Sequence, residues 1–292
     1  MNCQLIFFGV TVSISSESEK LIERICDIFK KYIVSDITPA VYFKIEILSN
    51  AFTQDYYFDM AVITNENIKV EYSFDNEKYF LWEYTDTFLP PLQVEPLKNK
   101  FLVLHGCGIE HFGSTAIFLA PSLAGKTTLA MKMLDNGSRC ITDDLLFIRS
   151  NLVYPYLKPV GIRESSFPIF PHLEAKVKEI INKDTLVFSN ASGYRTWLLH
   201  LDDIYGADIF STYPTPIDYI FLPNFNDERS VRIIEKAELY KLILNSACNS
   251  GMHHLSVSRN ALQIMKSLKG AFYLPTKNLD NAYKHIESIL GG

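Results

Sequence analysis

The sequence has few of the features that mark membrane, secreted or nucleic-acid-binding proteins. None of its 292 residues belongs to an apolar run of about eighteen residues, so a membrane-spanning helix is not expected. The five cysteines are scattered without a CxxC pair, which argues against a disulfide framework and a structural zinc site. The net charge is −5 and long runs of Lys or Arg are missing, so no nucleic-acid partner is expected.

The N-terminus also lacks the positively charged segment that opens a secretory signal peptide. Because neither export nor membrane signals occur, we expect a cytoplasmic protein without a membrane partner. Hydrophobic residues make up 48% of the chain and charged residues 21%, which is typical of a folded globular protein. The length fits one large domain or two smaller domains.

The first part of the chain has the pattern of a small α/β domain. Residues 4–12 are strand-like, and Ser16 with Glu19 forms a capping box that predicts a helix over 17–32. Short β-branched and aromatic runs follow from about residue 40 to residue 84, with Asn and Asp between them. This pattern predicts an antiparallel meander.

A proline-rich segment marks the predicted boundary between two domains. Three prolines lie between Pro90 and Pro96. We therefore predict an N-terminal α/β domain at 1–97 and a second domain at 98–292. The first domain carries no catalytic motif, and its strands could hold a peptide by strand addition.

The second domain alternates strands and helices. Strand-like runs at 101–113 and 114–120 precede a helix at about 127–135, and a buried run follows at 139–148. Strand, helix and strand in this order predict an α/β nucleotide-binding core. Later segments predict two more strands and three more helices, at 217–223, 236–248, 259–270, 271–275 and 278–290.

The strand at 117–119 and the next helix flank a Walker A-like loop. In the pattern G-x-x-x-x-G-K-[ST] the glycine turns backbone N–H groups toward phosphates, the lysine reaches phosphate oxygens and the hydroxyl ligates Mg²⁺. Alanine replaces the first glycine here. The alternative is an ordinary helix start. The predicted nucleotide-binding residues are Ala120, Pro121, Ser122, Leu123, Ala124, Gly125, Lys126, Thr127 and Thr128.

Two adjacent carboxylates, Asp143 and Asp144, interrupt the buried run after this helix. Carboxylates in a strand are costly unless a cation or hydrogen-bond donors meet them, so a metal on nucleotide phosphates is the natural partner. Adjacent strand residues point to opposite faces, so a strand end or bend is needed for both to face one ligand. A turn or a helix cap is the alternative. His105, in an apolar strand, fits either a core residue or a catalytic residue.

Taken together, residues 102–149 resemble the HPr kinase family, whose core is similar to that of ATP-type phosphoenolpyruvate carboxykinases. The shared elements are His105-Gly106, the loop at 120–127, and a Gly-x-Arg segment leading to the acid pair. The resemblance implies an HPr-kinase-like P-loop core that uses ATP and Mg²⁺.

The resemblance also implies roles for individual residues. His105 would lie beside the metal and the transferred phosphoryl group, and Lys126 would bind the phosphates. Asp143 is assigned as the base, and Asp144 joins Thr127 as a metal ligand, with the reverse open. The segment 157–166 offers three further candidates for phosphate or substrate contacts: Lys158, Arg163 and Glu164. The alternative for each of them is a solvated charge in a loop.

These features predict a kinase that transfers the γ-phosphoryl group of ATP to a serine hydroxyl on a peptide or small protein. Related kinases modify ribosomally made peptides, including lasso-peptide precursors, which makes a peptide acceptor plausible. The alternatives are a kinase acting on a metabolite and a nucleotide-binding regulatory module without catalysis. The oligomeric state, including a homo-oligomer, stays open.

Overall fold

The computed structural model describes residues 1–53, 56–64, 69–74, 96–97, 99–121, 124–180, 187–189, 195–224, 230–248 and 254–291. The chain divides into two compact units, Met1–Leu97 with Lys158–Leu199, and Lys98–Leu157 with His200–Gly292. The first segment of the first unit ends at Leu97. The segment 158–199, expected in the second domain, groups with the first unit instead. A functional division into two domains stays a prediction.

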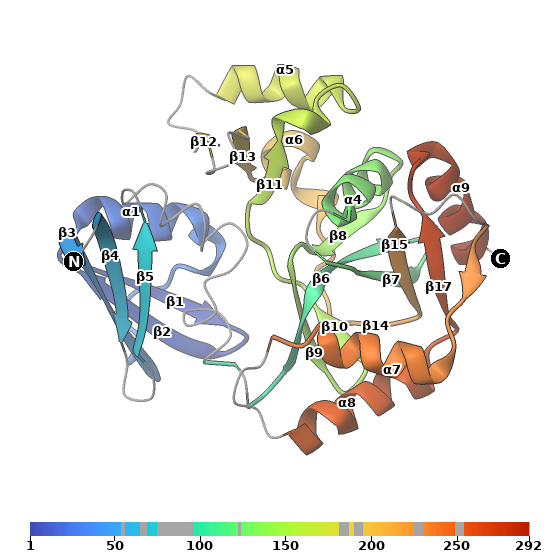
Figure 1. Cartoon of the computed structure of the whole chain (residues 1–292), viewed down its shortest axis with the longest axis horizontal. Helices are drawn as coiled ribbons and strands as arrows, with labels where there is room; N and C mark the ends of the chain where they lie inside the picture. The colour runs from blue at the N-terminus through green and yellow to red at the C-terminus, as the bar shows by residue number, and fades with distance from the viewer. Residues whose placement is uncertain are drawn as a thin grey trace. The chain divides into compact units, whose positions relative to one another are not determined.

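A five-stranded sheet forms the N-terminal part of the first unit (Figure 1). Helix α1 joins the parallel strands β2 and β3, as a crossover between parallel strands requires, and the other neighbours are antiparallel. In sheet order the strands are β1 (Asn2–Phe7), β2 (Val10–Ser16), β3 (Val41–Thr53), β4 (Tyr56–Thr64) and β5 (Lys69–Phe74), with α1 at Glu19–Ile28 and a short 3-10 helix η1 at Lys30–Tyr32.

Two expectations for this sheet are wrong in detail. Residues 4–12 do not form one strand, because Phe8 and Gly9 take positive φ values of 50° and 79° and turn the chain into the hairpin of β1 and β2. Helix α1 is capped by Ser18, whose hydroxyl accepts the Leu21 N–H at 3.3 Å, and not by Ser16. The meander is confirmed through β5, while its last run at 78–84 lies outside the described residues.

The remainder of the first unit is a small three-stranded sheet with a helix. The antiparallel order is β11-β13-β12. Its elements are β11 (Val160–Arg163), the 3-10 helix η3 (Glu164–Ser166), α5 (Pro171–Ile180), β12 (Val187–Ser189) and β13 (Arg195–Leu199).

The second unit is built on one mixed sheet, with strand order β14-β10-β9-β6-β7-β15-β17-β16 and β8 also paired with β6. β7, β15 and β17 run parallel, and the other pairs are antiparallel. The elements are β6 (Leu102–His111), β7 (Ser114–Leu119), α4 (Lys126–Asp135), β8 (Arg139–Thr142), β9 (Leu145–Arg149), β10 (Leu152–Tyr154), α6 (Leu201–Tyr205), η5 (Ala207–Ile209), β14 (Thr215–Pro216), β15 (Tyr219–Asn224), β16 (Arg232–Ile233), α7 (Lys236–Asn245), α8 (His254–Ser267), β17 (Gly270–Pro275) and α9 (Leu279–Leu290).

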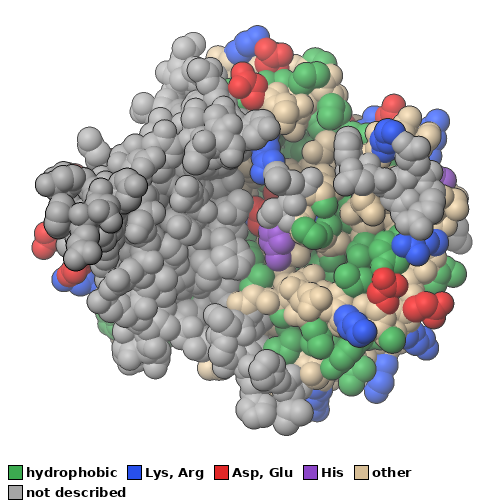
Figure 2. All heavy atoms as spheres, in the orientation of Figure 1, with side chains coloured by type: hydrophobic (Ala, Val, Ile, Leu, Met, Phe, Trp, Pro, Cys, Tyr) green, Lys and Arg blue, Asp and Glu red, His purple; other side chains and the backbone are tan. Residues whose placement is uncertain are grey.

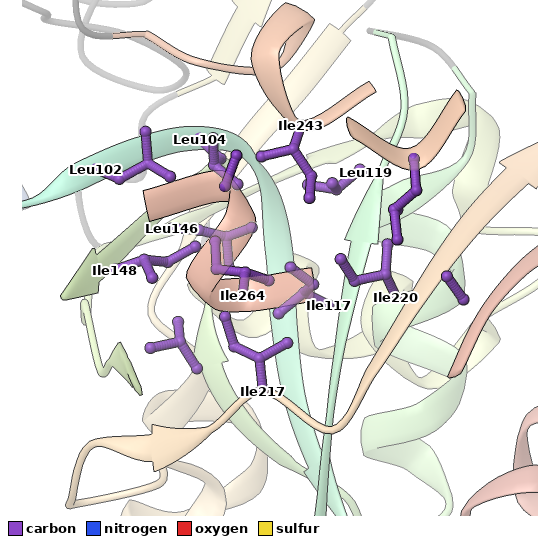
Figure 3. Close-up of a cluster of buried hydrophobic side chains, with 14 of the residues drawn as sticks. Leu102, Leu104, Ile117, Leu119, Leu146, Ile148, Ile217, Ile220, Ile243 and Ile264 are labelled. Carbon is purple, nitrogen blue, oxygen red and sulfur yellow. The ribbon is translucent and has the colours of Figure 1, made fainter. Parts of the chain in front are cut away.

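Helices cover both faces of this sheet (Figure 1). Successive side chains of β7 point to opposite faces. Ile117 and Leu119 join a buried cluster with α7 and α8, whereas Ala116 and Phe118 join a cluster with α4 and α9. Figure 3 shows the first cluster, where leucine and isoleucine side chains of the strands meet Ile264 and its neighbours. The unit is therefore a three-layer α/β structure, in agreement with the expected class.

The predicted order of elements in the second unit is confirmed. The runs at 217–223 and 271–275 form β15 and β17, and the three later helices form as α7, α8 and α9. None of the described helices has the length and apolar character needed to cross a membrane. On the face drawn in Figure 2, the described Lys and Arg side chains are scattered among acidic and apolar ones.

Helix α8 allows a matched test of this packing. Ile264 is fully buried in the cluster, while Leu262 on the same helix is 49% exposed. We expect Ile264→Ala to lower the free energy of unfolding by roughly 2–5 kcal/mol, because it leaves a cavity. Leu262→Ala should change it by less than about 0.5 kcal/mol. Urea unfolding followed by circular dichroism measures both, and equal losses would contradict this orientation of α8.

Candidate functional site

The predicted phosphate loop connects the buried strand β7 to helix α4. Gly125 precedes the helix with a φ of 86° and a ψ of 15°, a left-handed conformation that glycine adopts without strain. Lys126 is the first residue of the helix. The helix ends at the C-cap residue Asn136, and Gly137 after it also has a positive φ. The loop therefore ends at a helix N-terminus, where unpaired N–H groups and the helix dipole favour an anion.

The ammonium group of Lys126 is held by three acceptors. It donates to the backbone oxygens of Ala120 at 2.7 Å and Pro121 at 3.0 Å, and it lies 3.2 Å from Nε2 of His105. Alanine in place of the first glycine is compatible with this arrangement, because Ala120 contributes its carbonyl and has no positive φ. Lys126 is 6% exposed, so its ammonium group is held beside the loop and largely shielded from solvent.

The two aspartates lie in a tight turn between β8 and β9, as a bend in the buried run requires. Asp144 has a φ of 65°, and the Leu145 N–H donates to the carbonyl oxygen of Asp143 at 2.9 Å. The Thr142 hydroxyl donates to the carbonyl oxygen of Leu145 at 2.6 Å and closes the turn. Asp143 and Asp144 are both buried.

The carbonyl oxygen of Asp144 connects this turn to β6. It accepts the Gly106 N–H at 3.0 Å and lies 3.1 Å from Nδ1 of His105. Because a carbonyl oxygen can only accept, Nδ1 carries the proton and Nε2 presents its lone pair to Lys126. His105 thus joins the aspartate turn to the phosphate loop in its neutral form.

Position 106 has no room for a side chain larger than that of glycine. A Cβ there would lie 2.6 Å from the carbonyl oxygen of Phe118 and within 2.9 Å of the Leu119 and Leu146 side chains. β6 therefore passes between β7 and β9 at a distance that no other residue allows. This close approach brings His105 beside both the loop and the turn.

The Thr127 hydroxyl lies 3.4 Å from each carboxylate oxygen of Asp143. A hydroxyl and a carboxylate are oxygen ligands of the kind that Mg²⁺ prefers, usually with waters and substrate phosphates completing its shell. Within the described residues, no group of three or more His, Cys, Asp or Glu side chains is arranged to hold a metal. Thr127 and Asp143 fit a metal that arrives with a nucleotide.

Cys107 is a buried neighbour of the site that stands in no sequence motif. Its thiol donates to the carbonyl oxygen of Lys126 at 3.8 Å and so contacts the first turn of α4. Burial, and then the negative charge of Asp143, raises the pKa of the Cys107 thiol. The thiol stays protonated at neutral pH and serves packing, because only the thiolate is a strong nucleophile.

A second contact outside the predicted site fixes the far end of α4. The Tyr205 hydroxyl donates to Oδ1 of Asp135 at 2.6 Å, and burial together with this bond raises the pKa of Tyr205. Neither Tyr205 nor Thr142 stands in a recognisable motif, so the sequence held no signal for their contacts.

Two further groups of predicted site residues need to be distinguished. Ser122 and Leu123 lie outside the described residues. Lys158, Arg163 and Glu164 belong to the first compact unit, and their role at the phosphate loop stays a prediction. Lys158 is 3% exposed and donates to the carbonyl oxygen of Pro159 at 3.3 Å, so it is no solvated surface charge. Arg163 and Glu164 are exposed.

Comparisons with known proteins find only weak similarity to this chain. No family model matches the sequence. No curated protein matches it either. Among solved structures, the chain is similar to the Hpr(Ser) kinase/phosphatase from Coxiella burnetii, with 12% identity, a TM-score of 0.23, and coverage of 45% of this chain and 72% of that chain. A likeness of this size does not assign the chain to a family.

Alanine substitutions at the two glycines that flank α4 can distinguish backbone strain from a loss of phosphate binding. Both glycines have positive φ, and a Cβ at Gly125 or Gly137 would meet no atom within 4 Å. We expect either substitution by alanine to lower the free energy of unfolding by roughly 1–2 kcal/mol through backbone strain. Only Gly125→Ala should also weaken binding of magnesium triphosphate, measured by isothermal titration calorimetry. Equal weakening by Gly137→Ala would mean that the loop is not the phosphate site.

Proposed function

We propose that this protein is an ATP-dependent kinase that phosphorylates a serine hydroxyl of a peptide or small protein. The observation that carries the proposal is the meeting of three groups at the start of α4. These are the buried ammonium of Lys126, the Thr127 hydroxyl beside Asp143, and His105 held between the lysine and the aspartate turn. Phosphoryl transfer depends mainly on positioning and charge stabilisation, which such groups supply.

Lys126 is the proposed phosphate ligand. Two of its three partners are carbonyls of the loop itself, and the third is the neutral ring of His105. A phosphate oxygen that replaces the histidine contact would gain a charged donor already fixed in place. Such a preorganised donor is typically worth about 10²–10³ in rate.

The proposed metal ligands are Thr127 and Asp143. Their contact favours the reverse of the assignment made from the sequence, in which Asp144 shared the metal with Thr127. A bound Mg²⁺ would neutralise charge on the phosphates of ATP. Asp143 and Thr127 would orient that charge at the N-terminus of α4.

Asp144 then becomes the proposed base. Its carbonyl oxygen is bonded to His105 and Gly106, which fixes the position of this residue beside the phosphate loop. The acceptor oxygen bonds to the γ-phosphorus as the bond from that phosphorus to the bridging oxygen breaks and ADP leaves. The hydroxyl proton passes to Asp144, since a serine hydroxyl barely ionises at neutral pH.

We also infer that the second unit is an HPr-kinase-like core. The histidine-glycine pair, the loop and the acid pair carry the sequence resemblance, and the structure has contacts of 3.4 Å or less between each two of them. The acceptor is proposed to be a peptide, such as a lasso-peptide precursor, because the chain adds a β-rich segment without a catalytic motif. Such a sheet could bind an extended peptide by strand addition.

The two aspartates can be distinguished by magnesium titration. Asp143→Asn should raise the Mg²⁺ concentration needed for half-maximal activity, because it removes a proposed ligand. Asp144→Asn should lower kcat by roughly 10²–10⁴ with little change in the Mg²⁺ dependence. Lys126→Ala, which should lose transfer in all conditions, serves as the reference. Identical titration curves for the two asparagine variants would contradict the division of roles.

The acceptor can be tested with labelled ATP, Mg²⁺ and the peptides encoded beside the gene. We expect one peptide to be labelled on serine, as located by mass spectrometry, because a peptide offers enough surface to hold its hydroxyl in line with the γ-phosphate. The same peptide with that serine replaced by alanine is the control. Labelling of a sugar or free amino acid with all peptides inert would favour a metabolite kinase. Nucleotide binding without any transfer would favour a regulatory module.

A further inference from the structure

Three parallel strands of the second unit end at one edge of the sheet. β15 lies between β7 and β17. Phe221 pairs with Phe118, and β15 then runs on to Asn224, three residues beyond this last pair with β7, while β7 ends at Leu119 just before the phosphate loop. Asn224 in turn pairs with Pro275, the last residue of β17. The carboxyl ends of such strands are the usual place for ligands in α/β proteins.

The junction after β17 also lies beside the helix that follows the loop. α9 begins at Leu279, and Asp280 in its first turn forms an ion pair with Lys132 of α4, with 2.6 Å between Oδ1 and Nζ. Side chains of α4 and α9 share one buried cluster. The start of α9, which follows β17, therefore packs against the helix that follows the loop.

The proposed metal and γ-phosphate site lies on the other side of β7. His105 is on β6, and the aspartate turn joins two strands that both pair with β6. β6 and β15 are the two neighbours of β7. A nucleotide whose γ-phosphate points toward β6 can extend over β15 and β17, whose ends are about 5 and 10 Å from β7. That span is within the reach of a nucleoside triphosphate.

Two polar side chains stand at these ends. Asn224 is exposed, and its carbonyl oxygen accepts the Thr276 N–H at 3.1 Å. Thr276 is 6% exposed, and its hydroxyl finds no hydrogen-bond partner among the residues that the structure describes. A buried hydroxyl without a partner is unfavourable, so this one is suited to a ligand. Rotation about χ1 exchanges the hydroxyl and the methyl group between staggered positions.

We propose that the ends of β15 and β17 form the nucleoside subsite of the kinase. The Asn224 amide, which can both donate and accept, bonds the edge of the base, and the Thr276 hydroxyl bonds the ribose. This inference rests on the proposed nucleotide-binding function. It adds the half of the nucleotide that the phosphate loop does not contact.

The test compares magnesium ATP with magnesium inorganic triphosphate, which lacks the nucleoside. Isothermal titration calorimetry on the full chain should show tighter binding of ATP by the wild type. Asn224→Ala and Thr276→Val should each weaken ATP binding roughly three- to tenfold, as expected for one hydrogen bond, and leave triphosphate binding unchanged. Thr276→Ser should keep the wild-type affinity. Lys126→Ala should weaken the binding of both ligands.

The stability of Thr276→Val adds an independent readout. Its thermal midpoint should not fall, because the lost hydroxyl has no partner in the described protein and valine keeps the volume. If that variant does not fold, Asn224→Ala decides. Equal wild-type affinity for the two ligands, or equal weakening of both by the variants, would overturn the subsite. A wild type that binds neither ligand would instead overturn the proposed kinase.

Discussion

The candidate site depends on one carbonyl oxygen, that of Asp144. It accepts a backbone N–H from Gly106 and faces Nδ1 of His105. The first contact fixes the aspartate turn against β6. The second selects the tautomer of the histidine, which directs Nε2 toward Lys126. A backbone atom thus couples the acid pair to the phosphate loop, although the two are separated by a helix and a strand in the chain. The arrangement requires a residue in the left-handed conformation at position 144, which aspartate tolerates better than most residues.

Close approach between strands is the second constraint on the site. Gly106 has room for hydrogen only, since the carbonyl of Phe118 and a leucine from each neighbouring strand surround it. Gly125 is different, because the space around it is open and its backbone angle is what selects glycine. One glycine therefore sets the distance between strands and the other sets the direction of the chain. Substitutions at the two positions would fail for different physical reasons.

Much of this architecture could be predicted from local signals. The apolar run before Gly125-Lys126-Thr127 gave the strand and helix around the loop, and Asn136-Gly137 gave the end of that helix. The partner of Thr127 could not be predicted, because it depends on how β8 and β9 both pair with β6. The first hairpin has no local signal at its first turn residue, since Phe8, a residue typical of strands, takes a positive φ there. Sequence patterns report local geometry, and the site is assembled by long-range pairing.

β7 belongs to both hydrophobic clusters of the second unit, because its alternate side chains face the two helical layers. Opening of this strand would disrupt both layers at once, so its amide protons should exchange with solvent only through near-complete unfolding. The loop that follows β7 is thus attached to one of the last parts of the fold to open. Slow hydrogen exchange in 114–119 would show that the segment leading to Lys126 stays anchored until the whole unit unfolds.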